Sequence, residues 1–285
     1  MFKRIISILR FGRGARMVGV IRLDGVIGGG TFRSGLTDER LGPVIEKVFK
    51  IKKLKAVAII INSPGGSPAQ SSLLHQRIRR LSKEKNIPVI AFVEDVAASG
   101  GYWLAVSADE IFVNANSIVG SIGVIYSGFG FTKAIEKLGV ERRLHTAGEN
   151  KSLLDPFLPE EDEDIERLAV IQEKLHKNFI SIVQSRRGQR LKPNTTNLYS
   201  GDFWLGESAL ELGLVDGIGE LVGIMKERFG QDVRLRHIGL KKGWFRRRLS
   251  FPGSGGERMA DMGGSMALGV ISALESKAFW SRYGL

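Results

Sequence analysis

The sequence predicts an α/β fold, a mostly parallel sheet within a single domain. Strand-like and helix-like segments alternate at short spacing from residue 17 to about residue 238, which is typical of βαβ units. One segment, 56–61, is a continuous β-branched apolar run, as expected of a parallel strand buried on both faces. Polar, glycine-rich loops follow the predicted strands, where open α/β sheets place their sites.

The elements can be placed in chain order. Thr37 has the side chain of an N-cap and predicts the start of a helix, and Pro159 with the acidic residues behind it suits the start of a long one. The domain is predicted to cover 17–238, preceded by a basic segment (1–16) and followed by a basic, glycine-rich tail (239–285). Strands are expected at 17–23, 56–61, 88–93, 110–113, 121–126 and 140–146, and helices at 37–53, 68–85, 100–106, 132–138 and 159–187.

Composition removes several classes of function. Cysteine is absent, so disulfides and thiolate metal sites are excluded. The four histidines are scattered, and the sequence has no GxxxxGK[ST] phosphate loop. The three glycines at 28–30 are not a dinucleotide fingerprint, because no helix is predicted directly behind them. We therefore expect no cofactor and no metal.

The net charge of +12 is concentrated at the two ends. The first ten residues place apolar side chains on one helical face and basic ones elsewhere, which is typical of a helix lying in a membrane interface. This stretch is shorter than the roughly 20 apolar residues of a membrane span, and it lacks the features of a secretory signal. A second basic cluster, 241–248, includes two aromatic residues. We expect peripheral contact with an anionic membrane surface and no nucleic-acid partner; solvated tails are the alternative.

Two loops carry candidate chemistry. The loop 62–66 offers backbone N–H groups free of side-chain obstruction, which can hold a developing oxyanion. Ser99 stands between Ala98 and two glycines at a predicted strand-to-helix turn. This arrangement is similar in kind to a nucleophile elbow, although the GxSxG pattern is absent. Taken alone, each loop is more simply explained as a turn followed by a helix N-cap.

Five short motifs together resemble the signal peptide peptidase A family, membrane-associated bacterial serine peptidases related in fold to the Clp protease and crotonase. The resemblance runs from about residue 18 to residue 222. The motifs are Ile61-Asn62-Ser63-Pro64-Gly65-Gly66, Ala98-Ser99-Gly100-Gly101-Tyr102, Gly120-Ser121-Ile122-Gly123-Val124, Lys151-Ser152 and the late pair Gly206-Glu207-Ser208-Ala209 and Gly213-Leu214-Val215-Asp216.

The resemblance implies a role for each site residue. Ser99 is then the nucleophile, Lys151 the general base and Ser121 the hydroxyl that orients the lysine amine. Gly66 and Gly100 supply the oxyanion N–H groups. The fold implied is a Clp/crotonase-like superhelix of repeated ββα units.

The resemblance also implies an assembly and a substrate class. The motifs occur once, as in the family's single-domain short form, which implies a closed homo-oligomeric ring. Whether the dyad lies within one chain or between two is left open. The implied substrates are cleaved signal peptides and other apolar, unfolded segments. We expect no N-terminal transmembrane anchor of the kind usual in the family, and therefore a peripheral location on the bacterial inner membrane, more on the cytoplasmic face than outside.

The proposed base makes a physical demand. Lysine is a base only when neutral, and its ordinary pKa is about 10.4. To work near neutral pH, that pKa must fall to about 7, which desolvation can achieve. The polar loop around Lys151 does not itself exclude water, so folding or a neighbouring subunit must do so.

Three rival interpretations remain open. A crotonase-like acyl-CoA enzyme shares the two-loop oxyanion hole but typically has glycine at the position of Ser99. A Clp-type peptidase needs a histidine about 25 residues after the serine, where this chain has Val124; His145 is the imidazole that could compete. A catalytically silent membrane-surface scaffold would need neither Ser99 nor Lys151.

Overall fold

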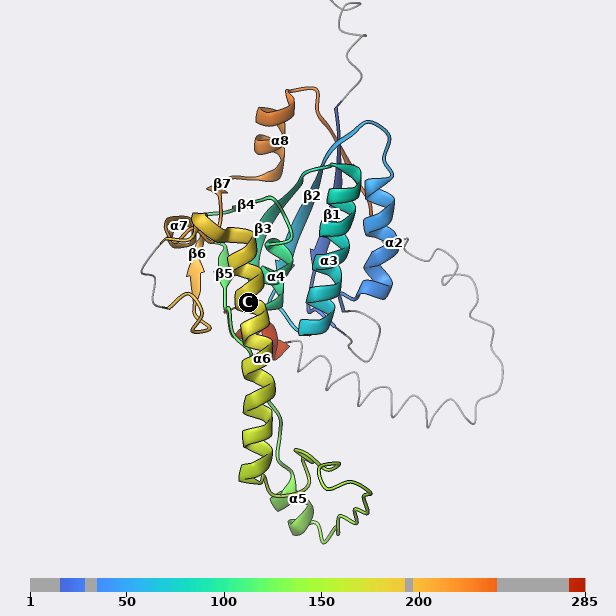
Figure 1. Cartoon of the computed structure of the whole chain (residues 1–285), viewed down its shortest axis with the longest axis vertical. Coiled ribbons are helices and arrows are strands. Elements are labelled where there is room, and N and C mark those ends of the chain that lie inside the picture. The colour runs from blue at the N-terminus through green and yellow to red at the C-terminus, as the bar shows by residue number, and fades with distance from the viewer. Residues whose placement is uncertain (1–15, 29–34, 193–196, 240–276, 285) are drawn as a thin grey trace, which may run out of the picture.

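The computed structural model describes residues 16–28, 35–192, 197–239 and 277–284. One sheet organises this part of the chain (Figure 1), with strand order β6-β5-β3-β2-β1-β8 and with β4 paired to β3 and β7. Every pairing is parallel except β5 with β6. The strands are β1 Met17–Asp24, β2 Leu54–Ser63, β3 Val89–Ala98, β4 Glu110–Val113, β5 Ile118–Gly120, β6 Phe203–Leu205, β7 Gly217–Ile218 and β8 Arg234–His237. The helices are α2 Asp38–Phe49, α3 Pro68–Lys85, α4 Gly100–Ala105, α5 Thr132–Lys137, α6 Asp162–Arg187, α7 Gly206–Glu211 and α8 Leu221–Phe229, with a 3₁₀ turn η2 at Gly188–Arg190.

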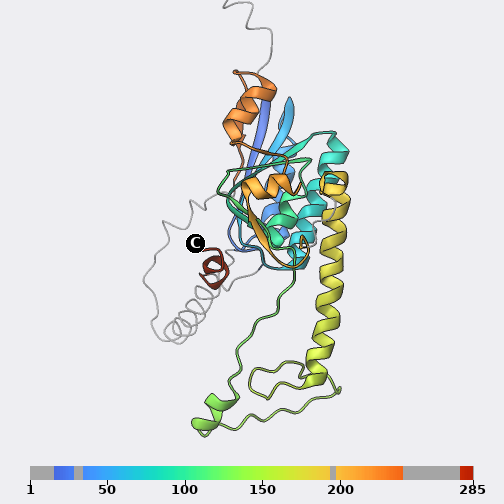
Figure 2. The same cartoon turned by 90° about the vertical axis from the view of Figure 1, so that its left-hand side faces the viewer.

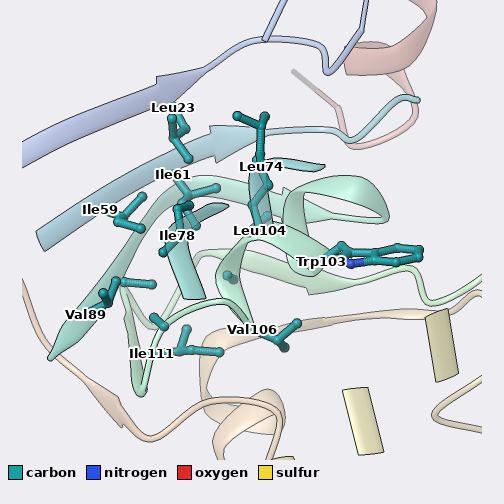
Figure 3. Close-up of a cluster of buried hydrophobic side chains, with 14 of the residues drawn as sticks. Leu23, Ile59, Ile61, Leu74, Ile78, Val89, Trp103, Leu104, Val106 and Ile111 are labelled. Atoms are coloured by element: carbon teal, nitrogen blue, oxygen red, sulfur yellow. The ribbon is translucent and has the colours of Figure 1, made fainter. Parts of the chain in front are cut away.

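The central strands are buried on both faces, which explains their continuous apolar sequences. Alternate residues of β2 point to opposite sides, so Ile59 and Ile61 enter one core and Ala58 and Ile60 the other. The first and larger core lies under α2, α3 and α4 (Figure 3), and the second lies under α8, where Met225 is fully buried.

Local signals explain several boundaries. Thr37 caps α2 by accepting a hydrogen bond from the N–H of Arg40. Helix α3 begins at Pro68, directly after Ser67, and ends at Asn86 in the left-handed conformation, as is common for helix C-termini. These boundaries, and β4, agree with the prediction. The parallel order of the main strands confirms the α/β architecture.

Two predicted strands are wrong. Residues 121–126 do not form a strand; the sheet strand in this region is β5, which ends at Gly120. Residues 140–146 are exposed and form no strand. Apolar residues of both segments, such as Ile125 and Val140, are exposed in this chain.

Residues 125–171, here called the arm, project from the sheet. Figures 1 and 2 both place α5, the loop behind it and the N-terminal end of α6 at the end of the molecule far from the strands. Helix α6 then returns to the sheet. The arm exposes many large apolar side chains: Ile125, Tyr126, Phe129, Phe131, Leu138, Val140, Leu144, Phe157, Ile165, Val170 and Ile171.

The predicted membrane-binding features lie mostly outside the described residues. These are the apolar stripe of the first ten residues, the basic cluster 241–248 and most of the tail. The described end of the tail forms a short helix at 277–281, and the Tyr283 ring meets the Phe203 ring of β6 edge-on, with centroids 5.4 Å apart. None of the helices within the described ranges combines the length and the hydropathy needed to cross a bilayer.

Candidate active site

Ser99 occupies a strained turn between β3 and α4. It is the N-cap of α4, with φ 52° and ψ −123°, a backbone conformation that residues other than glycine rarely adopt. Its N–H donates to the carbonyl oxygen of Gly120 at 2.8 Å, and its own carbonyl oxygen accepts from the N–H of Trp103 at 3.0 Å. The side chain makes no capping hydrogen bond. The backbone is therefore held on both sides, while the partly exposed hydroxyl is left available.

Glycines let the loop after β2 approach this turn. A Cβ built on Gly65 would stand 2.8 Å from the Cβ of Ser99 and 2.9 Å from the backbone nitrogen of Gly100. A Cβ on Gly100 would stand 2.5 Å from the Oγ of Ser71. The atoms that a Cβ on Gly65 would meet belong to the backbone or to a Cβ, so this position requires glycine, whereas a Cβ on Gly100 would displace the Ser71 hydroxyl.

The same approach brings two predicted oxyanion donors together. A Cβ on Gly100 would lie 3.3 Å from the backbone nitrogen of Gly66. Gly100 is the first residue of α4, and the first N–H groups of a helix have no acceptor within it. Within the described ranges, neither of these two N–H groups donates a hydrogen bond. Two adjacent N–H groups without acceptors, beside a serine hydroxyl, can stabilise an oxyanion.

Ser121 lies next to this site. It follows Gly120, whose carbonyl oxygen holds the N–H of Ser99, and it is 8% exposed with φ 52°. Its own N–H donates to the carbonyl oxygen of Asp202 at 2.6 Å. The ring of Trp204 closes over Gly120, where an added Cβ would meet it at 2.7 Å. The strand pair β5–β6 therefore fixes Ser121 one residue away from the contact that holds Ser99.

Lys151 is not part of this cluster within one chain. It is exposed and stands in the turn 149–154, with its N–H donating to the carbonyl oxygen of Gly148 at 3.2 Å. That turn belongs to the arm, between α5 and α6, which lies away from the sheet (Figure 2). The structure thus brings together Ser99, Gly66, Gly100 and Ser121, and places the predicted base elsewhere. His145 is exposed on the same arm.

Within the arm, three exposed aromatic side chains pack against one another. The ring of Phe131 packs against Phe129 and Phe157, with centroid distances of 6.3 and 5.6 Å. Arg142 lies over the ring of Phe157 and pairs with Asp155 at 2.7 Å. The hydrogen bond from Arg142 lowers the pKa of Asp155. These contacts flank the turn that carries Lys151.

The C-terminal end of α6 carries charged groups that the sequence analysis did not single out. Arg187 is 3% exposed and pairs with Asp216 at 2.7 Å. Burial acts to raise the pKa of Asp216, but hydrogen bonds from Arg187 and Arg190 outweigh it and leave that pKa lowered. Tyr102, fully buried on α4, donates its hydroxyl to the carbonyl oxygen of Leu214 at 2.7 Å. Such pairs join residues far apart in the sequence, so no local pattern could have revealed them.

Comparisons with known proteins place this site in a family. Residues 81–229 match the model of peptidase family S49, a range that includes Ser99, Ser121 and Lys151. A chloroplastic serine protease named SPPA from Arabidopsis thaliana is 34% identical over 202 residues, covering 68% of this chain and 29% of the relative. Protease 4 of Haemophilus influenzae is 33% identical over 205 residues, covering 71% of this chain and 32% of the relative.

A protein of Brucella melitensis named Na(+)/H(+) antiporter NhaA is 45% identical over 289 residues, which cover 100% of this chain and 39% of that protein. This chain therefore spans well under half the length of that relative. A solved structure of a membrane-bound stomatin-specific protease, a mutant in complex with a substrate peptide, has a TM-score of 0.52 at 16% identity and covers 79% of this chain and 93% of its own. The two share the Clp/crotonase-like fold. The chain belongs to peptidase family S49.

Proposed function

We propose that this chain is a serine endopeptidase in which Ser99 is the nucleophile and Lys151, supplied by a neighbouring subunit, is the general base. The observation that carries the proposal is the placement of Ser99: a strained N-cap whose free hydroxyl stands beside the unused N–H groups of Gly66 and Gly100. A turn with only a structural role needs neither that backbone strain nor two N–H groups that have no acceptor.

The proposed chemistry is acyl transfer in two steps. Neutral Lys151 takes the proton of the Ser99 hydroxyl as its oxygen attacks the carbonyl carbon of the scissile bond, and the N–H groups of Gly66 and Gly100 stabilise the oxyanion. The lysine ammonium then gives its proton to the leaving amine. Water hydrolyses the acyl-enzyme by the same route. Ser121 Oγ, which forms no hydrogen bond with the described residues, would accept from the lysine amine and orient it.

The position of Lys151 supports a shared site. On its own chain Lys151 is exposed on the arm, whereas a general base needs a lower pKa than free lysine has. A neighbour's site, covered by the apolar arm, would supply the dry surroundings. The exposed apolar residues of the arm favour contact with another subunit, because patches of this kind mark interaction surfaces. A head-to-tail contact forms a ring when its rotation closes, and a closed ring is the proposed assembly.

Hydrolysis of an apolar, unfolded peptide tests the dyad. We expect Ser99→Ala and Lys151→Ala each to lose at least about 1,000-fold in kcat, as loss of a nucleophile or its base does. His145→Ala is the matched control on the same arm and should keep nearly full activity. Activity in Lys151→Ala that disappears on adding His145→Ala would instead favour a Clp-type histidine base.

A serine-directed fluorophosphonate distinguishes a serine peptidase from a crotonase-like acyl-CoA enzyme and from a silent scaffold. It should label wild type and leave Ser99→Ala unlabelled. Labelling that survives in Ser99→Ala would sink the nucleophile assignment. An unlabelled, inactive wild type that still binds membranes would favour the scaffold.

The proposed substrates are apolar, unfolded segments such as cleaved signal peptides at a membrane surface. The proposed location is peripheral, on the cytoplasmic face of a bacterial inner membrane, and it rests on the basic, amphipathic sequence of the first sixteen residues. Co-sedimentation with vesicles containing anionic lipid should fall when residues 1–16 are removed. Equal binding by both forms would remove this part of the proposal.

A further inference from the structure

Helix α4, which begins directly after Ser99, is too short to hold its own position. It has six residues, all buried, and its N-cap contributes no side-chain hydrogen bond. Isolated helices of this length are not stable in water. The position of α4, and with it the position of Ser99, is therefore set by the groups packed around the helix.

Two arginines hold the chain where it leaves α4. Arg186 donates from Nε to the carbonyl oxygen of Val106 at 2.9 Å and from Nη2 to that of Ala108 at 2.8 Å. Arg79 donates to the carbonyl oxygen between them, that of Ser107, at 3.1 Å. Three successive carbonyls are thus bound by two guanidinium groups.

One carboxylate holds both guanidinium groups in place. Asp109 Oδ1 accepts from Arg79 at 2.7 Å and from Arg186 at 3.2 Å, while its Oδ2 accepts from the N–H of Val89 at 2.9 Å. The cluster is therefore anchored to the first residue of β3, the strand that ends in the Ser99 turn. His75, buried and without a hydrogen-bond partner for either ring nitrogen among the described residues, lies close enough to both arginines that their charges help to lower its pKa.

Helix α6, which carries Arg186, also contacts α4 at a second place, through an aromatic ring. Phe179 of α6 stacks on Trp103 of α4, with ring centroids 4.8 Å apart. One turn earlier, His176 Nε2 donates to the carbonyl oxygen of Ile122, next to Ser121, at 3.0 Å. The same helix extends into the arm. A single helix therefore joins the arm to both the Ser99 helix and the Ser121 loop.

We propose that Arg186 is a positioning residue. By binding the carbonyl oxygens that directly follow α4, it fixes where α4 lies along its own axis, and so where Ser99 stands relative to the Gly66 and Gly100 N–H groups. Because Arg186 is part of α6, it also couples that position to the arm. The inference rests on the proposed role of Ser99. A shift of about 1 Å at a catalytic group can cost 100-fold in rate, so loss of this grip should reduce turnover more than substrate binding.

Arg187 provides a matched control. It is the next residue on α6, is buried and also makes an ion pair and carbonyl hydrogen bonds, but these go to Asp216 and Gly213 instead of the exit of α4. If Arg186 served stability alone, Arg186→Met and Arg187→Met would behave alike.

The experiment measures kcat and KM per fluorophosphonate-reactive site, together with Tm, for wild type, Arg186→Met, Arg186→Lys and Arg187→Met. We expect Arg186→Met to lower kcat about tenfold or more with KM within about twofold. Arg186→Lys should recover part of kcat, because an ammonium can bind one of the two carbonyls but lacks the planar fork that spans both. Arg187→Met should lower Tm at least as much and leave kcat within about twofold of wild type.

Two results would overturn the inference: wild-type kcat in Arg186→Met, or an equal fall of kcat in Arg187→Met. If Arg186→Met does not fold, Phe179→Leu replaces it. This variant removes the ring stack on Trp103 but keeps an apolar side chain. The same fall in kcat is expected, and the same two results would overturn the inference. Ser99→Ala is measured alongside. Retained activity there contradicts the proposed nucleophile, whereas an inactive Ser99→Ala with an unchanged Arg186→Met contradicts only the positioning role.

Discussion

Gly65 and Ser99 lie so close that a methyl group on Gly65 would stand 2.8 Å from the Cβ of Ser99. Gly25 has a similar positive φ, 109° against 105°, but an added Cβ there meets nothing within 4 Å. Alanine substitutions at the two glycines therefore separate two unfavourable free energies: that of a side chain on a backbone with positive φ, and that of crowding the nucleophile.

Gly65→Ala is expected to abolish peptide hydrolysis and to destabilise the fold by about 3 kcal/mol, the sum of left-handed strain and overpacking. Gly25→Ala should lose about 1–2 kcal/mol from strain alone and stay active. Urea unfolding and peptide hydrolysis measure both variants. An active Gly65→Ala would contradict the close approach of the two loops.

His75 should make the fold sensitive to mild acid. Burial, aided by the charges of Arg186 and Arg79, lowers the pKa of this imidazole from 6.5 to about 4. The folded chain keeps the ring neutral while the unfolded chain takes up a proton below pH 6.5. The contribution of His75 to the free energy of unfolding is therefore fully present above pH 6.5, and about 3 kcal/mol of it is lost as the pH drops to 4.

Unfolding measured by urea at several pH values checks this window. His75→Leu should flatten the curve between pH 6.5 and 4, since the carboxylates with lowered pKa values, such as Asp109 and Asp216, lose their contribution only below pH 4. His237→Leu, at an exposed histidine, should keep the slope. The same slope in His75→Leu and wild type would show that another group is responsible.

Asp216, which pairs with Arg187 at the C-terminal end of α6, is expected to contribute strongly to the free energy of unfolding. Removing its charge leaves Arg187, only 3% exposed, without its anion. Breaking a buried pair in this way costs about 3–5 kcal/mol. Asp216→Asn should show that loss in thermal or urea unfolding. Asp24→Asn removes an exposed pair with Arg22 at 3.5 Å and should cost less than about 1 kcal/mol; equal losses would contradict the account.

The arm is expected to carry the contact between subunits. Phe129 is 78% exposed, so Phe129→Ser should leave the folding of one chain nearly unchanged while shifting the assembly to smaller species in analytical ultracentrifugation. Val222→Ser, at an exposed residue of α8 outside the arm, should not change the assembly. An unchanged particle mass in Phe129→Ser would place the contact elsewhere.

Much of the fold could be predicted from the sequence, because strands buried on both faces leave an unmistakable run such as that of β2. The strands predicted at 121–126 and 140–146 are wrong for a physical reason: apolar residues in a segment do not say which surface that segment meets, and Ile125 and Val140 are exposed within one chain.

The site was predictable to a similar degree. The Ser99 turn and the Gly66 loop follow adjacent strands and carry recognisable motifs, and the structure brings them together. The grip of Arg186 on the exit of α4 could not have been predicted, because its partners lie about 80 residues away and arise only when α6 packs on the sheet.

The most direct test of the account mixes two inactive chains. Ser99→Ala and Lys151→Ala chains, carrying different tags, are co-assembled in equal amounts and purified through both tags. In a ring whose sites combine Ser99 of one subunit with Lys151 of the next, random mixing pairs intact residues at about one quarter of the sites. The account predicts recovery of about one quarter of wild-type kcat per chain. Verified mixed assemblies that stay inactive would contradict it.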